Sequence, residues 1–318
     1  MRCDIRPINF ETAMTPPPGS SAATALGLLA VIFWSSTVAF SRGLAENLGV
    51  FTAACAIYLG GGLLSGMALL AQRKRRRRLA QTTARYWLVC GGSFIVNIVC
   101  FHLAVGLAHG RHGIIEVGLI NYLWISLTLL LSVPILGKRP RWGLLPGMLA
   151  ACMGVALATV HNGPFVWAEF AANARANALP CILAFMGAVA WAVYSNFNRR
   201  WEAESGGGPT PIFLAVAGMI FLAMRLFVNE TAVWNAPVMA GLAATILFPT
   251  ILAYAFWDAA MRRGNVVLVV SVSYLTPVLS TLINCLYCGV SPGPKLWLAC
   301  FLVVAGAAQC RRSISDDG

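Results

Sequence analysis

Polar side chains recur at helical spacing within two long apolar stretches, residues 121–137 and 273–289. On a helix, positions i, i+3, i+7 and i+11 share one face. In the two stretches this face carries Asn121, Trp124, Thr128 and Ser132, and Ser273, Thr276, Ser280 and Asn284. Hydroxyl and amide groups can hydrogen-bond a solute inside an apolar layer, so the two polar stripes predict the walls of a path through a membrane. Hydrogen bonding between helices is the alternative role for such residues.

The two stretches are copies of one another. They lie 152 positions apart, Tyr-Leu is second and third in both, and Gly137 corresponds to Gly289. An offset of 157 carries Trp34 onto Trp191. The chain is therefore interpreted as an internal duplication.

Aromatic residues deep within apolar stretches form a second candidate group. They are Trp34, Tyr122, Trp124, Trp191, Tyr194, Tyr254, Trp257 and Tyr274. Large rings with hydrogen-bonding tips can line a pocket for a flat organic molecule, with core packing as the alternative. Tyr86 and Trp87 lie near the end of an expected span and are interpreted as part of the interfacial aromatic belt.

Four further residues carry polar groups within apolar stretches. Asn97 and Asn196 are candidates for the pathway or for helix association. Glu116 can take a proton or hold a substrate ammonium, or it is a surface carboxylate. Asp258 precedes Arg262 by four residues, which predicts an ion pair on one helix face.

Two prolines are candidate hinges. Pro277 lies within the second polar stripe and Pro134 near the end of the first. Proline removes a backbone hydrogen bond and can kink a helix, so the two could gate a path or form fixed kinks. The residue matched to Pro277 is Ile125. The two walls are therefore expected to move differently.

Several function classes are disfavoured. The motifs GxxxxGK[ST], HExxH and GxSxG are absent, so we expect neither an enzyme nor a bound cofactor or metal. The net charge of +12 would suggest nucleic acid for a soluble protein. However, the basic run at 73–78 has no interleaved aromatic residues, which favours binding to anionic lipid headgroups over nucleic acid.

The elements that must position these residues are helices in a membrane. Of the 318 residues 58% are hydrophobic and only 11% are charged, with a mean hydropathy of +0.74. Runs long enough to cross a hydrocarbon layer of about 30 Å are expected at 22–42, 50–71, 85–108, 112–136, 142–160, 178–199, 210–228, 238–261, 265–289 and 293–310. The sequence thus predicts an all-α polytopic membrane protein with ten transmembrane helices.

Basic residues between the runs predict the orientation. With both termini in the cytoplasm, 18 of the 23 Lys and Arg residues fall on the cytoplasmic side. The expected segments are a cytoplasmic tail (1–21), a first five-helix repeat (22–160), an extracytoplasmic loop (161–177), a second five-helix repeat (178–310) and a cytoplasmic tail (311–318). Because five is odd, the repeats are inverted, as in many secondary transporters.

This arrangement, with SYLTPVLSTLINCLYCG before a glycine-rich last helix, resembles the drug/metabolite transporter (EamA-like) superfamily. There the first helix of each half commonly carries a Trp-Gly-Ser-Asn-Phe type motif. Here only Trp34 and Trp191 match it, so no roles are transferred to the residues that follow them. The half containing NYLWISLTLLLSVPILG looks like the YddG group of bacterial inner-membrane exporters. This resemblance implies export of aromatic and other neutral amino acids and some cationic drugs, through a central cavity with bilobal gating.

Three functions remain open from the sequence. The favoured one is a monomeric secondary transporter that exports amino acids and similar small metabolites across the bacterial inner membrane by alternating access. The second is a proton-coupled multidrug exporter of lipophilic cations, with Glu116 as proton carrier. The third is a non-transporting membrane scaffold or enzyme.

Overall fold

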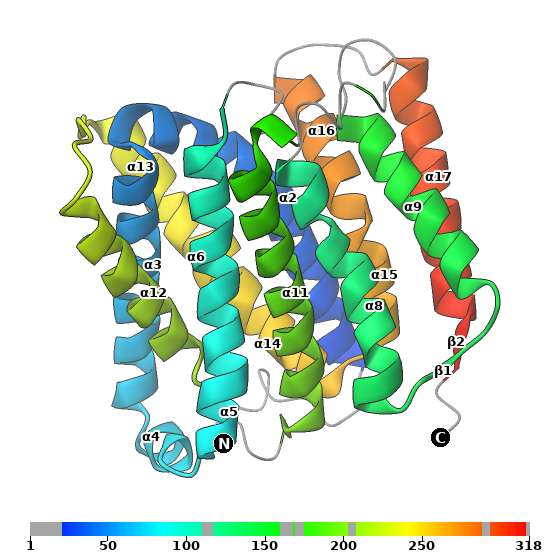
Figure 1. Ribbon diagram of the computed structural model, residues 1–318. Coiled ribbons are helices and arrows are strands. Elements are labelled where there is room, and N and C mark those ends of the chain that lie inside the picture. The colour runs from blue at the N-terminus through cyan, green and yellow to red at the C-terminus, as the bar shows by residue number, and fades with distance from the viewer. Residues whose placement is uncertain are drawn as a thin grey trace, which may run out of the picture.

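The computed structural model describes residues 21–109, 117–159, 168, 175–202, 208–287 and 293–315 (Figure 1). The first half contains α2 (Ser21–Leu48), α3 (Val50–Ala71), α4 (Arg73–Leu79), α5 (Ala84–Tyr86), the π-helical η1 (Trp87–Gly91), α6 (Gly92–Leu107), α8 (Leu123–Leu136) and α9 (Leu144–Thr159). The second half contains α11 (Ala178–Arg200), α12 (Thr210–Arg225), α13 (Ala236–Thr245), the π-helical η3 (Ile246–Leu252), α14 (Ala253–Arg263), α15 (Val266–Ser273), α16 (Leu275–Tyr287) and α17 (Pro294–Arg312). Two short strands, β1 (Arg139–Pro140) and β2 (Ile314–Ser315), pair antiparallel.

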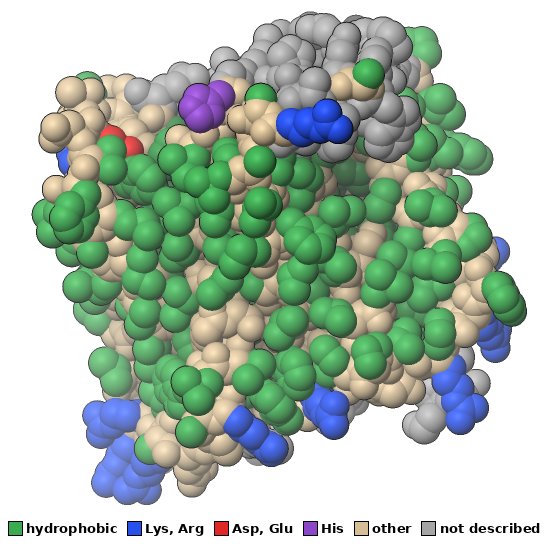
Figure 2. All heavy atoms as spheres, viewed as in Figure 1, with side chains coloured by type: hydrophobic (Ala, Val, Ile, Leu, Met, Phe, Trp, Pro, Cys, Tyr) green, Lys and Arg blue, Asp and Glu red, His purple; other side chains and the backbone are tan. Residues whose placement is uncertain are grey.

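Among the described residues, five helical segments are long and apolar enough to cross a membrane. They are Val50–Ala71, Ala84–Leu107, Val117–Leu136, Ala178–Arg200 and Ala236–Arg263. Large apolar side chains such as Leu88, Leu149 and Phe301 are exposed on the outside of the bundle, and a broad apolar band covers the face seen in Figure 2. A surface of this kind is stable against lipid and costly against water. The predicted all-helical membrane class is confirmed.

Basic residues gather at one end of the bundle, which we call the basic end. Its segments are joined by contacts of Arg139 with Ser315, of Arg200 with the Ile135 carbonyl, of Arg199 with the Arg262 carbonyl and of Arg263 with Glu202. Figure 2 shows most of the visible Lys and Arg side chains along this lower rim. The Thr24 hydroxyl accepts a hydrogen bond from the backbone of Asn265. The start of α2 therefore lies at the basic end too.

At the opposite end, Glu230 caps the start of α3. Its carboxylate accepts hydrogen bonds from the backbone amides of Phe51 and Thr52 at 3.0 and 2.8 Å, and Arg225 lies 3.8 Å away. Gly49, with φ +80°, leaves the space that the carboxylate fills. Burial alone would raise the pKa of Glu230, but the hydrogen bonds from Phe51 and Thr52 and the charge of Arg225 lower it overall.

Two pairs of outer helices flank the bundle, α3 with α12 and α9 with α17 (Figure 1). In the first pair, Gly62 lies against the backbone of Ala215, and Gly218 lies against the backbone of Leu59. Gly62 and Gly218 are 156 positions apart, as are Leu59 and Ala215. The two contacts are therefore reciprocal: the glycine of each helix packs against the corresponding residue of the other helix.

The second pair repeats this reciprocity. A Cβ at Gly154 would lie 2.9 Å from the Ala299 carbonyl oxygen, and one at Gly306 would lie 2.6 Å from the Gly147 carbonyl oxygen. Gly154 and Gly306 are 152 positions apart, as are Gly147 and Ala299. Small residues allow helix backbones to approach this closely in a membrane. Both outer pairs are thus packed through matched glycines.

Helix interruptions occur at matched tyrosines. Because Pro277 has no amide hydrogen, the Ser273 carbonyl loses its usual helical donor, and the helix is interrupted at Tyr274 between α15 and α16. A turn also occurs at Tyr122, directly before α8. Since Ile125 retains its amide, the first interruption does not arise from proline. Pro134 lies inside α8, which continues to Leu136.

Candidate functional site

A cluster of aromatic rings fills the centre of the bundle. Its members, called the aromatic cluster, are Trp34, Phe94, Trp124, Trp191, Tyr194, Tyr254 and Trp257. The centroids of Trp34 and Trp191 lie 5.6 Å apart in a T-shaped contact, and Trp257 lies 5.2 Å from Trp34 and 5.8 Å from Trp191. Edge-to-face contacts of this kind are favourable. The cluster joins side chains from α2, α6, α8, α11 and α14.

The indole of Trp34 is fixed by the irregular helix η3. Its Nε1 donates to the Pro249 carbonyl at 3.0 Å. Pro249 lies in the π-helical segment and cannot donate to the Thr245 carbonyl, which instead accepts the Thr250 hydroxyl at 2.9 Å. π-helical turns leave backbone groups available and are frequent at functional sites. The interruption of regular hydrogen bonding thus positions a ring of the cluster.

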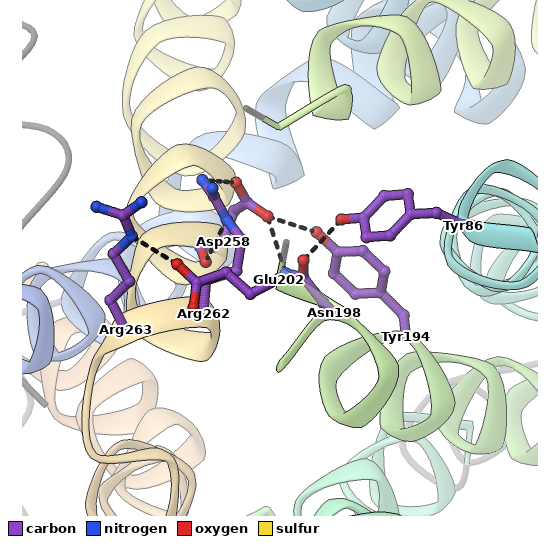
Figure 3. A network of polar contacts seen from close by, with 7 residues as sticks. All are labelled: Tyr86, Tyr194, Asn198, Glu202, Asp258, Arg262 and Arg263. Carbon is purple, nitrogen blue, oxygen red and sulfur yellow. Dashed lines mark hydrogen bonds and ion pairs between the residues drawn. The ribbon is translucent and has the colours of Figure 1, made fainter. Parts of the chain in front are cut away.

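A buried polar network lies on the basic side of the cluster (Figure 3). Asp258 accepts hydrogen bonds from Asn198 at 2.8 Å and from Arg262 at 2.5 Å, and Tyr194 lies 3.5 Å from it. The Tyr86 hydroxyl donates to Asn198 at 2.6 Å. The network ties α5, α11 and α14 together. The predicted Asp258–Arg262 ion pair is confirmed. It is buried, and it belongs to the network that connects these three helices.

Tyr86 corrects a sequence interpretation. It is fully buried and bonded to Asn198, so it is not part of the interfacial belt. Its position near the end of an apolar run suggested the interface, but position along a helix does not reveal which side faces a neighbour. Phe94 and Asn198 are not predictable as members of the site, because one apolar ring in an apolar run and one amide near a helix end carry no distinguishing local signal.

Most hydroxyl groups of the polar stripes donate a hydrogen bond to a backbone carbonyl of their own helix. Thr128, Ser132 and Ser273 donate to the carbonyls of Trp124, Leu129 and Val269. Such bonds to the preceding turn satisfy a hydroxyl without any solute. Ser280 is buried on α16.

Two stripe residues keep an unpartnered polar atom. Asn121 Oδ1 and Thr276 Oγ1 are buried and have no hydrogen-bond partner among the described residues. The helices that carry the stripes are joined by Ser126 and Tyr274, whose hydroxyl oxygens lie 2.6 Å apart. Buried polar atoms without partners are costly. Among the described stripe residues, these two therefore keep unused hydrogen-bonding capacity.

Two of the predicted asparagines connect helices. Asn97 Nδ2 donates to the Gly187 carbonyl at 2.9 Å, and Asn196 Nδ2 donates to the Thr128 carbonyl at 3.0 Å. These contacts tie α6 and α8 to α11. Glu116 and the side chain of Asn284 lie outside the described residues. In the part of the chain that is described, no group of three His, Cys, Asp or Glu side chains is arranged to hold a metal ion.

Comparison with known proteins agrees with this architecture. The EamA-like transporter family matches residues 21–160 and 178–309. The aromatic amino acid exporter YddG of Salmonella typhimurium is 32% identical over 294 residues, which cover 92% of this chain and 97% of that protein. The YddG exporter of Escherichia coli is 31% identical over 91% of this chain and 96% of that protein.

A solved structure shares the fold. This crystal structure superimposes with a TM-score of 0.73 at 27% sequence identity, covering 92% of this chain and 96% of that one. The two matched family segments together span most of the chain. The chain therefore belongs to the EamA-like transporter family.

Proposed function

We propose that this protein exports aromatic amino acids from the cytoplasm, with the aromatic cluster at the substrate-binding position. Two relatives with coverage above nine-tenths of both chains are named aromatic amino acid exporters. A flat aromatic side chain can replace ring–ring contacts of the cluster with equivalent contacts of its own. Asn121 Oδ1 can accept a hydrogen bond from its ammonium group, and the Thr276 hydroxyl can donate one to its carboxylate.

The contact between Trp34 and Trp191 carries this proposal. The two tryptophans are matched positions of the internal duplication, and their rings touch at the centre of the bundle. Transporters built from inverted repeats bind their substrates where the two halves meet. The cluster is therefore the place at which a substrate would contact both halves at once.

The proposed mechanism is alternating access of two inverted five-helix halves. The reciprocal glycine contacts of the outer helix pairs support a two-fold relation between the halves. The polar network closes the basic side of the aromatic cluster, and the interruptions at Tyr122 and Tyr274 provide bending points, with Pro277 and Pro134 as accompanying hinges. The basic end faces the cytoplasm of a bacterial inner membrane in this proposal, and one chain forms a complete path.

Transport of radiolabelled phenylalanine into proteoliposomes tests the proposal. Purified wild-type protein is expected to accelerate uptake, and Trp191→Ala is expected to reduce it at least tenfold because it removes the ring that touches both Trp34 and Trp257. Trp297→Ala is the matched control, since Trp297 is 60% exposed on α17. Wild-type protein that moves neither phenylalanine, tyrosine nor tryptophan would refute the proposed function.

A further inference from the structure

A separate cavity opens at the basic end, away from the aromatic cluster. Its volume is about 550 Å³. It is bounded by the last turn of α8, the last turn of α11 and the turn between α14 and α15. The lining residues are Ile135, Leu136, Lys138, Arg199, Arg200, Gly264, Asn265, Val266 and Val267. The volume matches that of small-molecule sites.

The charge of this cavity has one sign. Lys138, Arg199 and Arg200 line it, and none of the described residues that line it is acidic. Arg199 donates through one nitrogen to the Arg262 carbonyl, and Arg200 donates through one nitrogen to the Ile135 carbonyl at 3.2 Å. Neither arginine has an acidic partner within the described parts of the chain. The carbonyl contacts hold both guanidinium groups in place while their remaining N–H groups stay available for an anion.

The other lining groups fit a small amphipathic molecule. Ile135, Leu136, Val266 and Val267 add apolar surface beside the cations. The backbone at the start of α15, whose first turn is capped by Asn265, also borders the cavity and adds partial positive charge. A molecule with one carboxylate and one apolar side chain would match both parts of this lining.

The cavity and the aromatic cluster share two helices, α8 and α11. On α11, Arg199 follows Trp191 by eight residues, or about 12 Å of helix. The hydrogen bond between Asn196 and the Thr128 carbonyl lies between the two levels. A substrate in the cavity would thus be separated from the aromatic cluster by this contact between α8 and α11.

We propose that this cavity is a vestibule on the cytoplasmic side that binds the carboxylate of the transported amino acid before it reaches the aromatic cluster. The inference rests on the proposed function and adds to it a first binding step, carried by Arg199 and Arg200. The same charge repels lipophilic cations. The vestibule therefore selects for carboxylate-bearing substrates over cationic drugs.

The test uses phenylalanine uptake into inside-out membrane vesicles, in which the cytoplasmic face contacts the medium. Replacing both arginines (Arg199→Gln with Arg200→Gln) is expected to raise KM about tenfold, with kcat changed less than twofold, because the lost charge acts on encounter and first binding. The KM of the wild type is expected to rise with ionic strength, and that of the variant to rise much less. Arg77→Gln, on the exposed helix α4, is the control for loss of a charge elsewhere at the basic end.

A second variant separates charge from folding. Arg199→Lys with Arg200→Lys keeps both charges and is expected to hold KM within about threefold of the wild type. In right-side-out vesicles, where phenylalanine is offered to the opposite face, the glutamine variant is expected to keep the wild-type KM.

The outcomes distinguish the two proposals. If the wild type does not transport phenylalanine, the proposed function itself fails. If the wild type transports but the glutamine variant keeps the wild-type KM and salt dependence, or if KM rises equally at both faces, the vestibule is refuted. If the KM effect disappears in phosphatidylcholine proteoliposomes, the cavity binds an anionic lipid headgroup instead, which also overturns the proposal.

Discussion

Asp258 and Arg262 form an ion pair that is buried in the bundle, away from both water and lipid. Their side chains are only 6% and 9% exposed, and Asn198 and Tyr194 supply further contacts to the carboxylate. A buried charge is stable only when it is paired and hydrogen-bonded. Each charge of this network is therefore stable only while its partners are present.

Removing the charge of Asp258 tests this dependence. Asp258→Asn leaves Arg262 buried without a counter-charge and is expected to cost about 3–5 kcal/mol of stability, measured as a lowered thermal midpoint in detergent. Glu202→Gln is the control, because its partner Arg263 is partly exposed and the loss is expected to be at most about 1 kcal/mol. Adding Arg262→Met to Asp258→Asn is expected to restore much of the midpoint, and failure to do so would contradict the assignment.

Glu230 makes the opposite end of the bundle sensitive to acid. Because the folded protein lowers the pKa of this carboxyl, its stabilising effect is fully present above the ordinary value of 4.5 and is lost as the pH falls through the lower folded value. Glu230→Gln is expected to cost roughly 1 kcal/mol near neutral pH. The difference in thermal midpoint between wild type and variant should narrow below about pH 4, and a difference that stays constant down to pH 3 would contradict this role.

At the scale of elements, α3 and α12 approach so closely that their contact depends on glycine. Gly62 faces the backbone of Ala215, whereas Gly66, one turn further along α3, has nothing within 4 Å of an added Cβ. Gly62→Ala is expected to destabilise the protein by about 2 kcal/mol through overpacking. Gly66→Ala is expected to be neutral or slightly stabilising. Thermal unfolding of the two variants in the same detergent measures the difference, and equal midpoints would contradict the close packing.

The sequence predicts elements better than contacts. Spans expected at 50–71 and 178–199 agree with α3 (Val50–Ala71) and α11 (Ala178–Arg200), because apolar length is a local property. The offset that matches Trp34 with Trp191 is also visible in the sequence. Burial of Tyr86 was not predictable, since it depends on Asn198, which is 112 positions away. The hydrogen bonds that the Thr128 and Ser273 hydroxyls donate to their own helices were not predictable either. Spacing alone cannot separate a hydroxyl that faces a path from one that donates to a carbonyl of its own helix.

For the whole molecule, the distribution of charge predicts the orientation in the membrane. The contacts that join Arg139, Arg200 and Arg263 to neighbouring segments collect basic residues at one end, and positive residues favour the cytoplasmic side. A green fluorescent protein fused to the C-terminus is therefore expected to fluoresce, and alkaline phosphatase fused at the same place is expected to be inactive. An active phosphatase would show that the basic end faces outward.

The reciprocal glycine contacts have a consequence for the ancestry of the chain. Gly62 packs against Ala215 while Gly218 packs against Leu59. Each half therefore carries both a glycine and the residue against which the glycine of the other half packs, and these contacts form the seam between α3 and α12. One half made as a separate polypeptide would carry everything that a second, oppositely inserted copy needs for pairing. Such a seam is a surface complementary to itself. Duplication and fusion of a gene for an antiparallel pair would then have required no new packing surface, only a linker between the copies.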